Sequence, residues 1–102
     1  MTYLETINIR TAGPIEAAKV LELCSETFQS IAVDQLMKVA VYSNAAYATD
    51  ISIQLQWKSD PGSESVLGRA LREALGDLGL INHTTWAEHE ELTAGRISAE
   101  AI

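Results

Sequence analysis

The stretch that decides the fold reads ISIQLQW, residues 51–57. Apolar and polar side chains alternate at every position of this stretch, and a period of two is typical of a strand with one buried face. Similar runs occupy residues 3–10, 36–43 and 80–87, whereas residues 14–29 and 63–79 repeat their apolar side chains at helical spacing. The order strand, helix, strand, strand, helix, strand predicts an α+β, ferredoxin-like domain, in which an antiparallel four-stranded sheet carries both helices on one face.

Local signals mark the ends of the two predicted helices. Pro14 suits the first turn of the first helix, where its missing N–H has no partner to lose. Ser63 is a candidate N-cap for the second helix. Gly79 follows the last apolar residue of that helix, and it predicts a left-handed stop there.

The alternation divides the strand residues between two faces of the sheet. We expect the apolar residues of strand 51–57 to face the helices together with Tyr3, Ile7, Ile9, Met37, Val39 and Val41. The opposite face then collects Leu4, Thr6, Asn8, Arg10, Lys38, Tyr42, Ser52, Gln54 and Gln56. This second face is polar but carries few charges.

Strand 80–87 is compatible with two orientations. If Ile81 faces the helices, the polar face gains Asn82, Thr84 and Trp86. If the strand is turned over, the polar face gains His83 and Thr85 instead. The sequence leaves both orientations open.

Composition limits the kinds of partner. The chain has 14 acidic and 7 basic residues and a net charge of −7, so it would repel nucleic acid and anionic membranes. No apolar run approaches the roughly 18 residues that a membrane span needs, and the first residues lack the basic start and apolar core of a signal peptide. Cys24 is the only cysteine, which excludes an internal disulfide and favours a reducing compartment. We therefore expect a cytoplasmic protein with no nucleic-acid or membrane partner.

The length of 102 residues suits one domain. We assign residues 1–92 to the ferredoxin-like domain and residues 93–102 to a C-terminal tail or dimer arm. One interpretation of the uncovered polar face is that it faces solvent, as antiparallel sheets commonly do. The other is that a second copy covers it, because the face is rich in amides and a lone four-stranded sheet leaves exposed edges. We expect a homodimer that forms through this face.

Residues 2–90 resemble the dimeric α+β barrel superfamily and, within it, the antibiotic-biosynthesis-monooxygenase-like proteins. The resemblance rests on the short ferredoxin-like unit, Gly13-Pro14 at the first helix, the polar strand face, and GLINHTTW at residues 79–86. It implies that two subunits pack their sheets face to face, and that each subunit keeps a small-molecule pocket either between its own sheet and helices or within the barrel. Some members oxidise aromatic polyketides with molecular oxygen and use neither metal nor flavin, so the resemblance implies that no cofactor is needed.

The haem-degrading branch of that superfamily fits less well. Its members place an Asn on the first strand and a Trp and a His in the region of the second helix. Asn8 is similar to the first of these, but residues 63–79 contain neither Trp nor His. The resemblance therefore does not extend to haem degradation.

The polar face supplies the candidate site residues. We predict His83, Asn8 and Tyr42 as catalytic residues, since imidazole is suited to proton transfer, although the sequence reveals no orienting partner for His83 and a structural or interface role stays open. Ligand contacts are expected from Arg10, Gln54, Gln56 and Trp86. An Arg can bind a carboxylate with two hydrogen bonds, and the alternative is that Arg10 pairs with an acidic residue at the rim of the sheet.

Neither the histidines nor the cysteine predict further chemistry. His83 and His89 lie six residues apart, but a metal site needs three or four ligands and no third one is evident, so no metal site is expected. Cys24 falls on the apolar stripe of the first helix, where we expect a buried and unreactive thiol.

These observations predict a small dimeric α+β barrel protein that binds a small organic molecule. Any enzyme activity would resemble cofactor-independent monooxygenation of a small aromatic compound. The alternative is a non-catalytic module that binds a small molecule or another protein.

Overall fold

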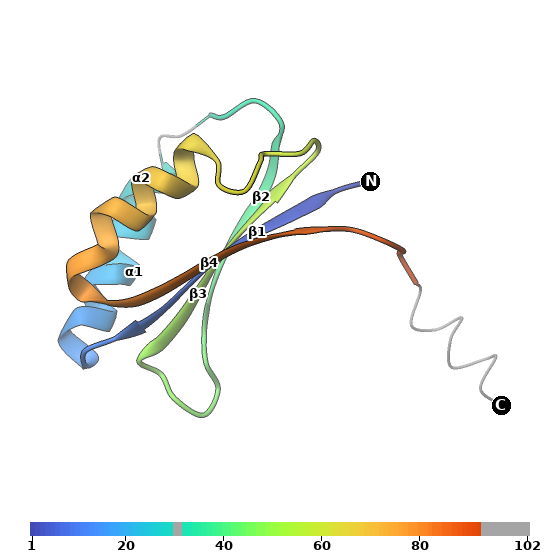
Figure 1. Cartoon of the computed structure of the whole chain (residues 1–102). Helices are drawn as coiled ribbons and strands as arrows, with labels where there is room; N and C mark the ends of the chain where they lie inside the picture. The colour runs from blue at the N-terminus through green and yellow to red at the C-terminus, as the bar shows by residue number, and fades with distance from the viewer. Residues whose placement is uncertain (30–31, 93–102) are drawn as a thin grey trace, which may run out of the picture.

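The computed structural model describes residues 1–29 and 32–92, so the predicted tail at residues 93–102 lies outside the described residues (Figure 1). Its strands are β1 (Tyr3–Thr11), β2 (Leu36–Ser43), β3 (Asp50–Trp57) and β4 (Gly79–Ala87). Helix α1 (Pro14–Gln29) follows β1, and helix α2 (Val66–Leu75) follows β3. A short 3-10 helix, η1 (Gly76–Leu78), connects α2 to β4.

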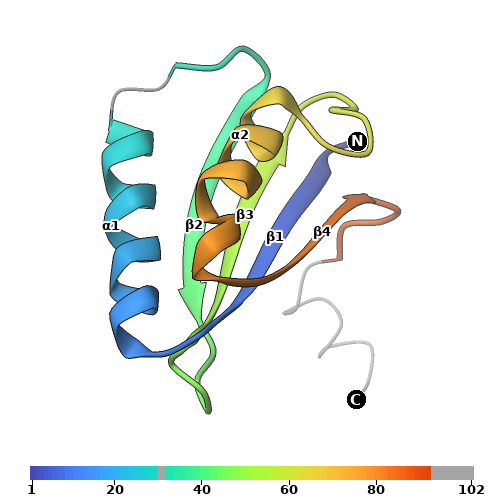
Figure 2. The same cartoon turned by 60° about the vertical axis from the view of Figure 1, so that its left-hand side comes forward.

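The four strands form one antiparallel sheet in the order β2-β3-β1-β4. Both helices lie on the same face of this sheet, and the other face is left without a covering layer (Figures 1 and 2). The predicted α+β, ferredoxin-like arrangement is therefore confirmed. No helix in the described part of the chain is long and apolar enough to cross a membrane.

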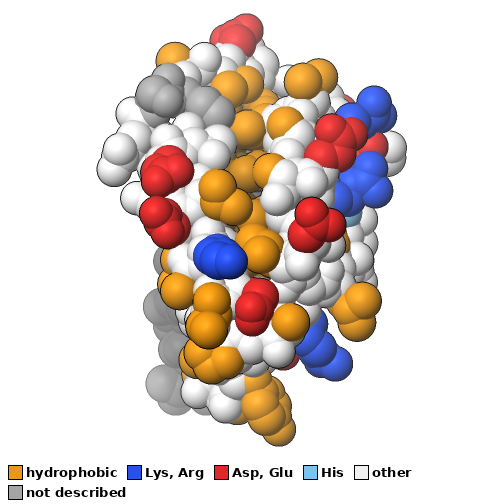
Figure 3. All heavy atoms as spheres, turned by 90° about the vertical axis from the view of Figure 1, so that its left-hand side faces the viewer, with side chains coloured by type: hydrophobic (Ala, Val, Ile, Leu, Met, Phe, Trp, Pro, Cys, Tyr) orange, Lys and Arg blue, Asp and Glu red, His pale blue; other side chains and the backbone are white. Residues whose placement is uncertain are grey.

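The core lies between the helices and the inward-facing residues of β1 and β3. It consists of Ile7, Ile9, Ala17, Val20, Cys24, Ile51, Ile53, Leu55, Trp57, Leu71 and Leu75. On the outer side of the helical layer, apolar side chains line the space between the two helices and acidic side chains flank it (Figure 3). This distribution is the one expected of amphipathic helices that bury one stripe each.

The N-cap of the second helix lies two residues later than the sequence predicts. Ser65, and not Ser63, is the N-cap: its hydroxyl accepts a hydrogen bond from the Gly68 amide at 2.8 Å. Before it, Gly62 adopts a φ of 83°, which favours glycine, and donates its amide to Asp60 Oδ1 at 2.8 Å. This turn delays the helix, so Ser63 stays in the preceding loop.

Gly79 does not form the left-handed stop that its position predicts. Its φ is 170°, which is extended backbone, and it is the first residue of β4. A Cβ atom at this position would collide with the carbonyl of Arg10 on β1. Gly79 is required because it allows the two backbones to approach closely at the start of the β1–β4 pairing.

Strand β2 contains an irregularity that the alternation did not predict. The pairing with β3 shifts between Leu36 and Lys38, so that Met37 lies outside the regular register. Met37 is consequently 48% exposed, and its predicted place in the core beside Val39 and Val41 is wrong.

Candidate functional site

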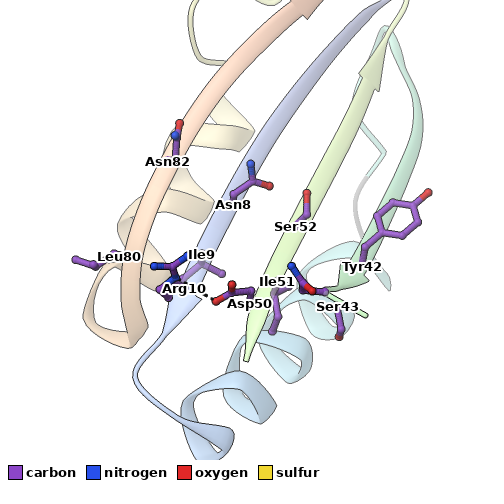
Figure 4. A pocket seen from close by; sticks show the side chains of 11 residues that line it. Asn8, Ile9, Arg10, Tyr42, Ser43, Asp50, Ile51, Ser52, Leu80 and Asn82 are labelled. Carbon is purple, nitrogen blue, oxygen red and sulfur yellow. Dashed lines mark ion pairs between the residues drawn. The ribbon is translucent and has the colours of Figure 1, made fainter. Parts of the chain in front are cut away.

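A pocket of about 420 Å³ opens on the uncovered face of the sheet, where β1 ends and β3 and β4 begin (Figure 4). Asn8 on β1 pairs in register with Ser52 on β3 and with Asn82 on β4. Their side chains therefore form a polar row across three neighbouring strands. Amide groups both donate and accept hydrogen bonds, so this row can bind either kind of group on a ligand.

A charged pair lies one step along the same strands. Arg10 Nε is 3.4 Å from Asp50 Oδ1, and the side chains are 76% and 25% exposed. The expected rim pairing of Arg10 is thus present, and an exposed pair of this kind contributes little to stability. Tyr42 on β2 completes the pocket with an aromatic ring at its side.

The structure brings some of the predicted site residues together. Asn8, Arg10 and Tyr42 line the pocket. Gln54, Gln56 and Trp86 lie on the same face but beyond the residues that line it. Trp86 Nε1 donates instead to Thr84 Oγ1 at 3.0 Å, and that hydroxyl lies 2.8 Å from Thr6 Oγ1.

Asp50 and Leu80 are among the lining residues that the sequence-based set of site residues did not include. The third strand was predicted to begin at Ile51, whereas β3 begins at Asp50. Extending the alternation of residues 51–57 by one position would have put Asp50 on the same face as Ser52. Leu80 could have been found in the same way from the orientation of Asn82.

His83 lies on the opposite face from the other predicted catalytic residues. Ile81 packs against the core, which selects the orientation of β4 that sends Asn82, Thr84 and Trp86 to the open face. The His83 side chain then points toward the helices and is 6% exposed. The structure therefore does not join His83 with Asn8 and Tyr42 in one site.

The orienting partner of His83 is Glu5, which is 0% exposed. His83 Nε2 lies 2.6 Å from Glu5 Oε2, and a carboxylate only accepts hydrogen bonds, so Nε2 is the donor. Ser65 donates to the same carboxylate from its amide (2.9 Å) and its hydroxyl (2.6 Å). Trp57 Nε1 donates at 3.0 Å. A buried carboxylate is thus fully supplied with donors.

Burial raises the pKa of the Glu5 carboxyl, but the hydrogen bonds from Ser65, His83 and Trp57 lower the pKa by more, so it ends below its usual value. The other ring nitrogen, His83 Nδ1, makes no hydrogen bond to a described residue and lies 3.4 Å from Glu64 Oε2. Glu64 also pairs with Arg69 and Arg72 at 2.9 and 3.1 Å. We call Glu5, Trp57, Ser65 and His83 the buried polar cluster.

Sequence reasoning missed this cluster because its members are far apart in the chain. The alternation of the first strand does place Glu5 beside Tyr3 and Ile7 on the helix side, which was the available signal. Gly68 makes room for the carboxylate, since a Cβ atom on Gly68 would collide with Glu5 Oε2.

The remaining candidates give no further site. Cys24 is buried in the core as expected, and burial raises the pKa of its thiol to about 11. Within residues 1–29 and 32–92, no three His, Cys, Asp or Glu side chains are grouped closely enough to hold a metal ion.

Comparisons with known proteins relate the fold to solved structures only. No protein-family model matches the sequence, and no curated protein matches it. A monooxygenase from the gene ActVA-Orf6 of Streptomyces coelicolor, solved with nanaomycin D, is 18% identical with a TM-score of 0.65, over 89% of this chain and 90% of that one. The cofactor-independent oxygenase SnoaB of Streptomyces nogalater is 11% identical with a TM-score of 0.63, over 89% and 96%.

A conserved protein from Methanosarcina mazei has a TM-score of 0.70 at 9% identity, over 87% of this chain and 94% of that one. These likenesses define the class of fold: the chain is an α+β, ferredoxin-like domain. In particular, it has the fold of the antibiotic-biosynthesis-monooxygenase-like proteins.

Proposed function

We propose that two copies of this chain pair through their open sheet faces and enclose the pocket around Asn8, where a small organic molecule binds. The observation that carries this proposal is the uncovered face itself (Figure 1). Tyr42, Leu80 and Trp86 are 50%, 77% and 62% exposed on it, beside polar side chains that are mostly uncharged. Exposed apolar groups with a polar surround are typical of an interaction surface.

The pocket supports a ligand with an aromatic ring and polar substituents. Its volume of about 420 Å³ is in the range of small-molecule sites. The amides of Asn8 and Asn82 would bind hydroxyl or carbonyl groups, and the ring of Tyr42 would contact an aromatic face. Asp50 already neutralises Arg10, which favours an uncharged ligand over a carboxylate.

The reaction that this site supports best is cofactor-independent monooxygenation of a small aromatic compound. Molecular oxygen would be the oxidant, and the substrate would supply the electrons: one oxygen atom enters the substrate and the other leaves as water. Asn8 would hold a substrate oxygen and stabilise negative charge that develops on it. Support comes from the fold shared with two oxygenases and from the position of Asn8 in the pocket.

The second candidate is a non-catalytic binding module, and the make-up of the pocket favours it. The ionisable side chains among the described lining residues are those of Arg10, Tyr42 and Asp50, and two of these are paired. His83, the candidate general base, lies behind the sheet. A module of this kind would bind the same ligands without consuming oxygen.

The first experiment measures the solution mass of the purified protein over a dilution series. A stable mass of twice the 11.1 kDa chain supports the paired sheets, and a monomer at every concentration overturns them.

The second experiment titrates hydroxylated naphthalenes while intrinsic fluorescence and oxygen uptake are recorded. Binding with oxygen uptake supports the monooxygenase, and binding without uptake supports the non-catalytic module.

A pair of variants tests the location of the site. Asn8→Ala removes an amide from the pocket and should weaken binding about tenfold, the effect of one lost hydrogen bond. Gln29→Ala removes an exposed amide from the end of α1, on the helix-covered side of the sheet, and should bind as the unmodified protein does. Equal affinities for the two variants would place the ligand elsewhere.

A further inference from the structure

Helix α2 is attached to the sheet in two different ways along its length. Its C-terminal half buries Leu71 and Leu75, which are 3% and 0% exposed, in the core. Its N-terminal part is anchored less deeply: Val66 is 90% exposed, and Leu67 packs against the core but is only partly buried. Gly68 lies in this N-terminal part, and a glycine inside a helix weakens it.

The loop before this helix is attached through polar contacts to β1 and β4. Ser63 accepts a hydrogen bond on its carbonyl from Thr85 Oγ1 at 3.0 Å. Glu64 faces His83 Nδ1 at 3.4 Å. Ser65 donates both its amide and its hydroxyl to Glu5. Ser63 and Ser65 are thus attached to the sheet by hydrogen bonds, and Glu64 lies between them beside His83.

Chemically capable groups lie beneath this segment. Glu5 is ionised and 0% exposed, Trp57 is 6% exposed, and the His83 side chain is 6% exposed. A carboxylate paired with an imidazole can transfer protons, and burial is what keeps the pair from ligands in this conformation. The unpartnered Nδ1 of His83 is a site where a ligand or a water molecule can bind once the cover is removed.

We infer that residues 58–69 form a lid over Glu5 and His83, which opens as a unit while the rest of the domain stays folded. Hydrogen bonds to the lid exchange for hydrogen bonds to water on opening, so the opening costs far less than exposing the core does. Leu71 and Leu75 hold the C-terminal part of α2 in the core, so movement is confined to residues 58–69. The lid lies on the opposite face of the sheet from the pocket around Asn8, so it does not depend on the proposed function.

Native-state hydrogen exchange on the full chain tests the lid directly. The amide of Ser65 donates to Glu5 on β1 when the lid is closed, so it reports the opening. We expect it to exchange about 100-fold faster than amides of the central strand β1, with almost no dependence on added denaturant. Rates and denaturant dependence equal to those of β1 would overturn the lid, and so would complete lack of protection.

A matched pair of variants on β4 provides the second measurement. Thr85→Val removes the hydroxyl that holds Ser63 and should speed exchange at the Ser65 amide about fivefold, while β1 is unchanged. Thr84→Val removes a hydroxyl from the adjacent residue, which faces away from the lid, and should leave the Ser65 amide unchanged. Equal effects of the two variants on this amide would overturn the inference.

Discussion

The two faces of the sheet differ in whether their polar side chains are buried and hydrogen-bonded within the protein or exposed to solvent. On the helix-covered face, Glu5 is fully buried and accepts four hydrogen bonds from the protein itself. On the open face, Asn8 and Asn82 are exposed, and the Arg10–Asp50 pair lies largely in solvent. The comparison shows how one strand serves two purposes: alternate residues of β1 stabilise the fold on one side and present free hydrogen-bonding groups on the other.

The largest expected effect is seen by comparing two variants, each of which neutralises one carboxylate on one face of the sheet. Glu5→Gln places an amide among four donors and should destabilise the protein by about 3–5 kcal/mol, the cost of disrupting a buried carboxylate and its hydrogen bonds. Asp50→Asn disrupts only an exposed pair and should cost about 1 kcal/mol or less. Urea denaturation measures both. Similar losses for the two variants would erase the distinction between the faces.

Acid should remove the contribution that Glu5 makes to the stability of the fold. Its hydrogen bonds hold the pKa of Glu5 below the ordinary glutamate value of about 4.3, so its stabilising contribution is complete above that value and is lost as the pH falls through the folded-state pKa. The stability difference between the unmodified protein and Glu5→Gln should therefore shrink as the pH is lowered from 5. Denaturation curves at several pH values measure it, and a difference that is constant with pH would contradict this account.

A smaller effect is expected from two glycines near α2. Gly68→Ala forces a methyl group against the Glu5 carboxylate and should cost about 1–3 kcal/mol through overpacking. Gly76→Ala meets nothing within 4 Å, and its helical backbone suits alanine, so it should be neutral or stabilise by up to about 1 kcal/mol. Thermal denaturation compares them. A Gly68→Ala variant that is as stable as the unmodified protein would mean that Glu5 is less tightly enclosed than its contacts indicate.

The sequence predicted the elements well because their signals are local. The alternation in residues 51–57 and the apolar stripe in residues 14–29 need no information from elsewhere in the chain, and the bounds of α1 agree with the prediction. Asn8, Arg10 and Tyr42 were found by the same periodic argument, since a shared face follows from register.

The predictions that failed for the helix cap and for His83 share one physical cause. Local rules allowed two arrangements, and contacts with distant residues selected one of them. Ser63 and Ser65 are both acceptable caps by local rules, and the Glu5 carboxylate favours Ser65 by accepting its amide and hydroxyl. His83 could face either way until Ile81 and Glu5 fixed β4. Glu5 itself was overlooked because a charged residue is rarely buried unless distant residues supply its partners.

The central position of β1 has a consequence for how the protein is made. β1 leaves the ribosome before the other three strands, yet its two neighbours in the sheet are β3 and β4, and the pairing with β4 extends to Ala87. Long-range pairing of this kind is slow, so an isoleucine-rich strand stays unpaired during translation. The charge of Glu5 sits within that strand, where it discourages self-association of the nascent chain. The residue that stabilises the finished fold also protects the chain before it folds.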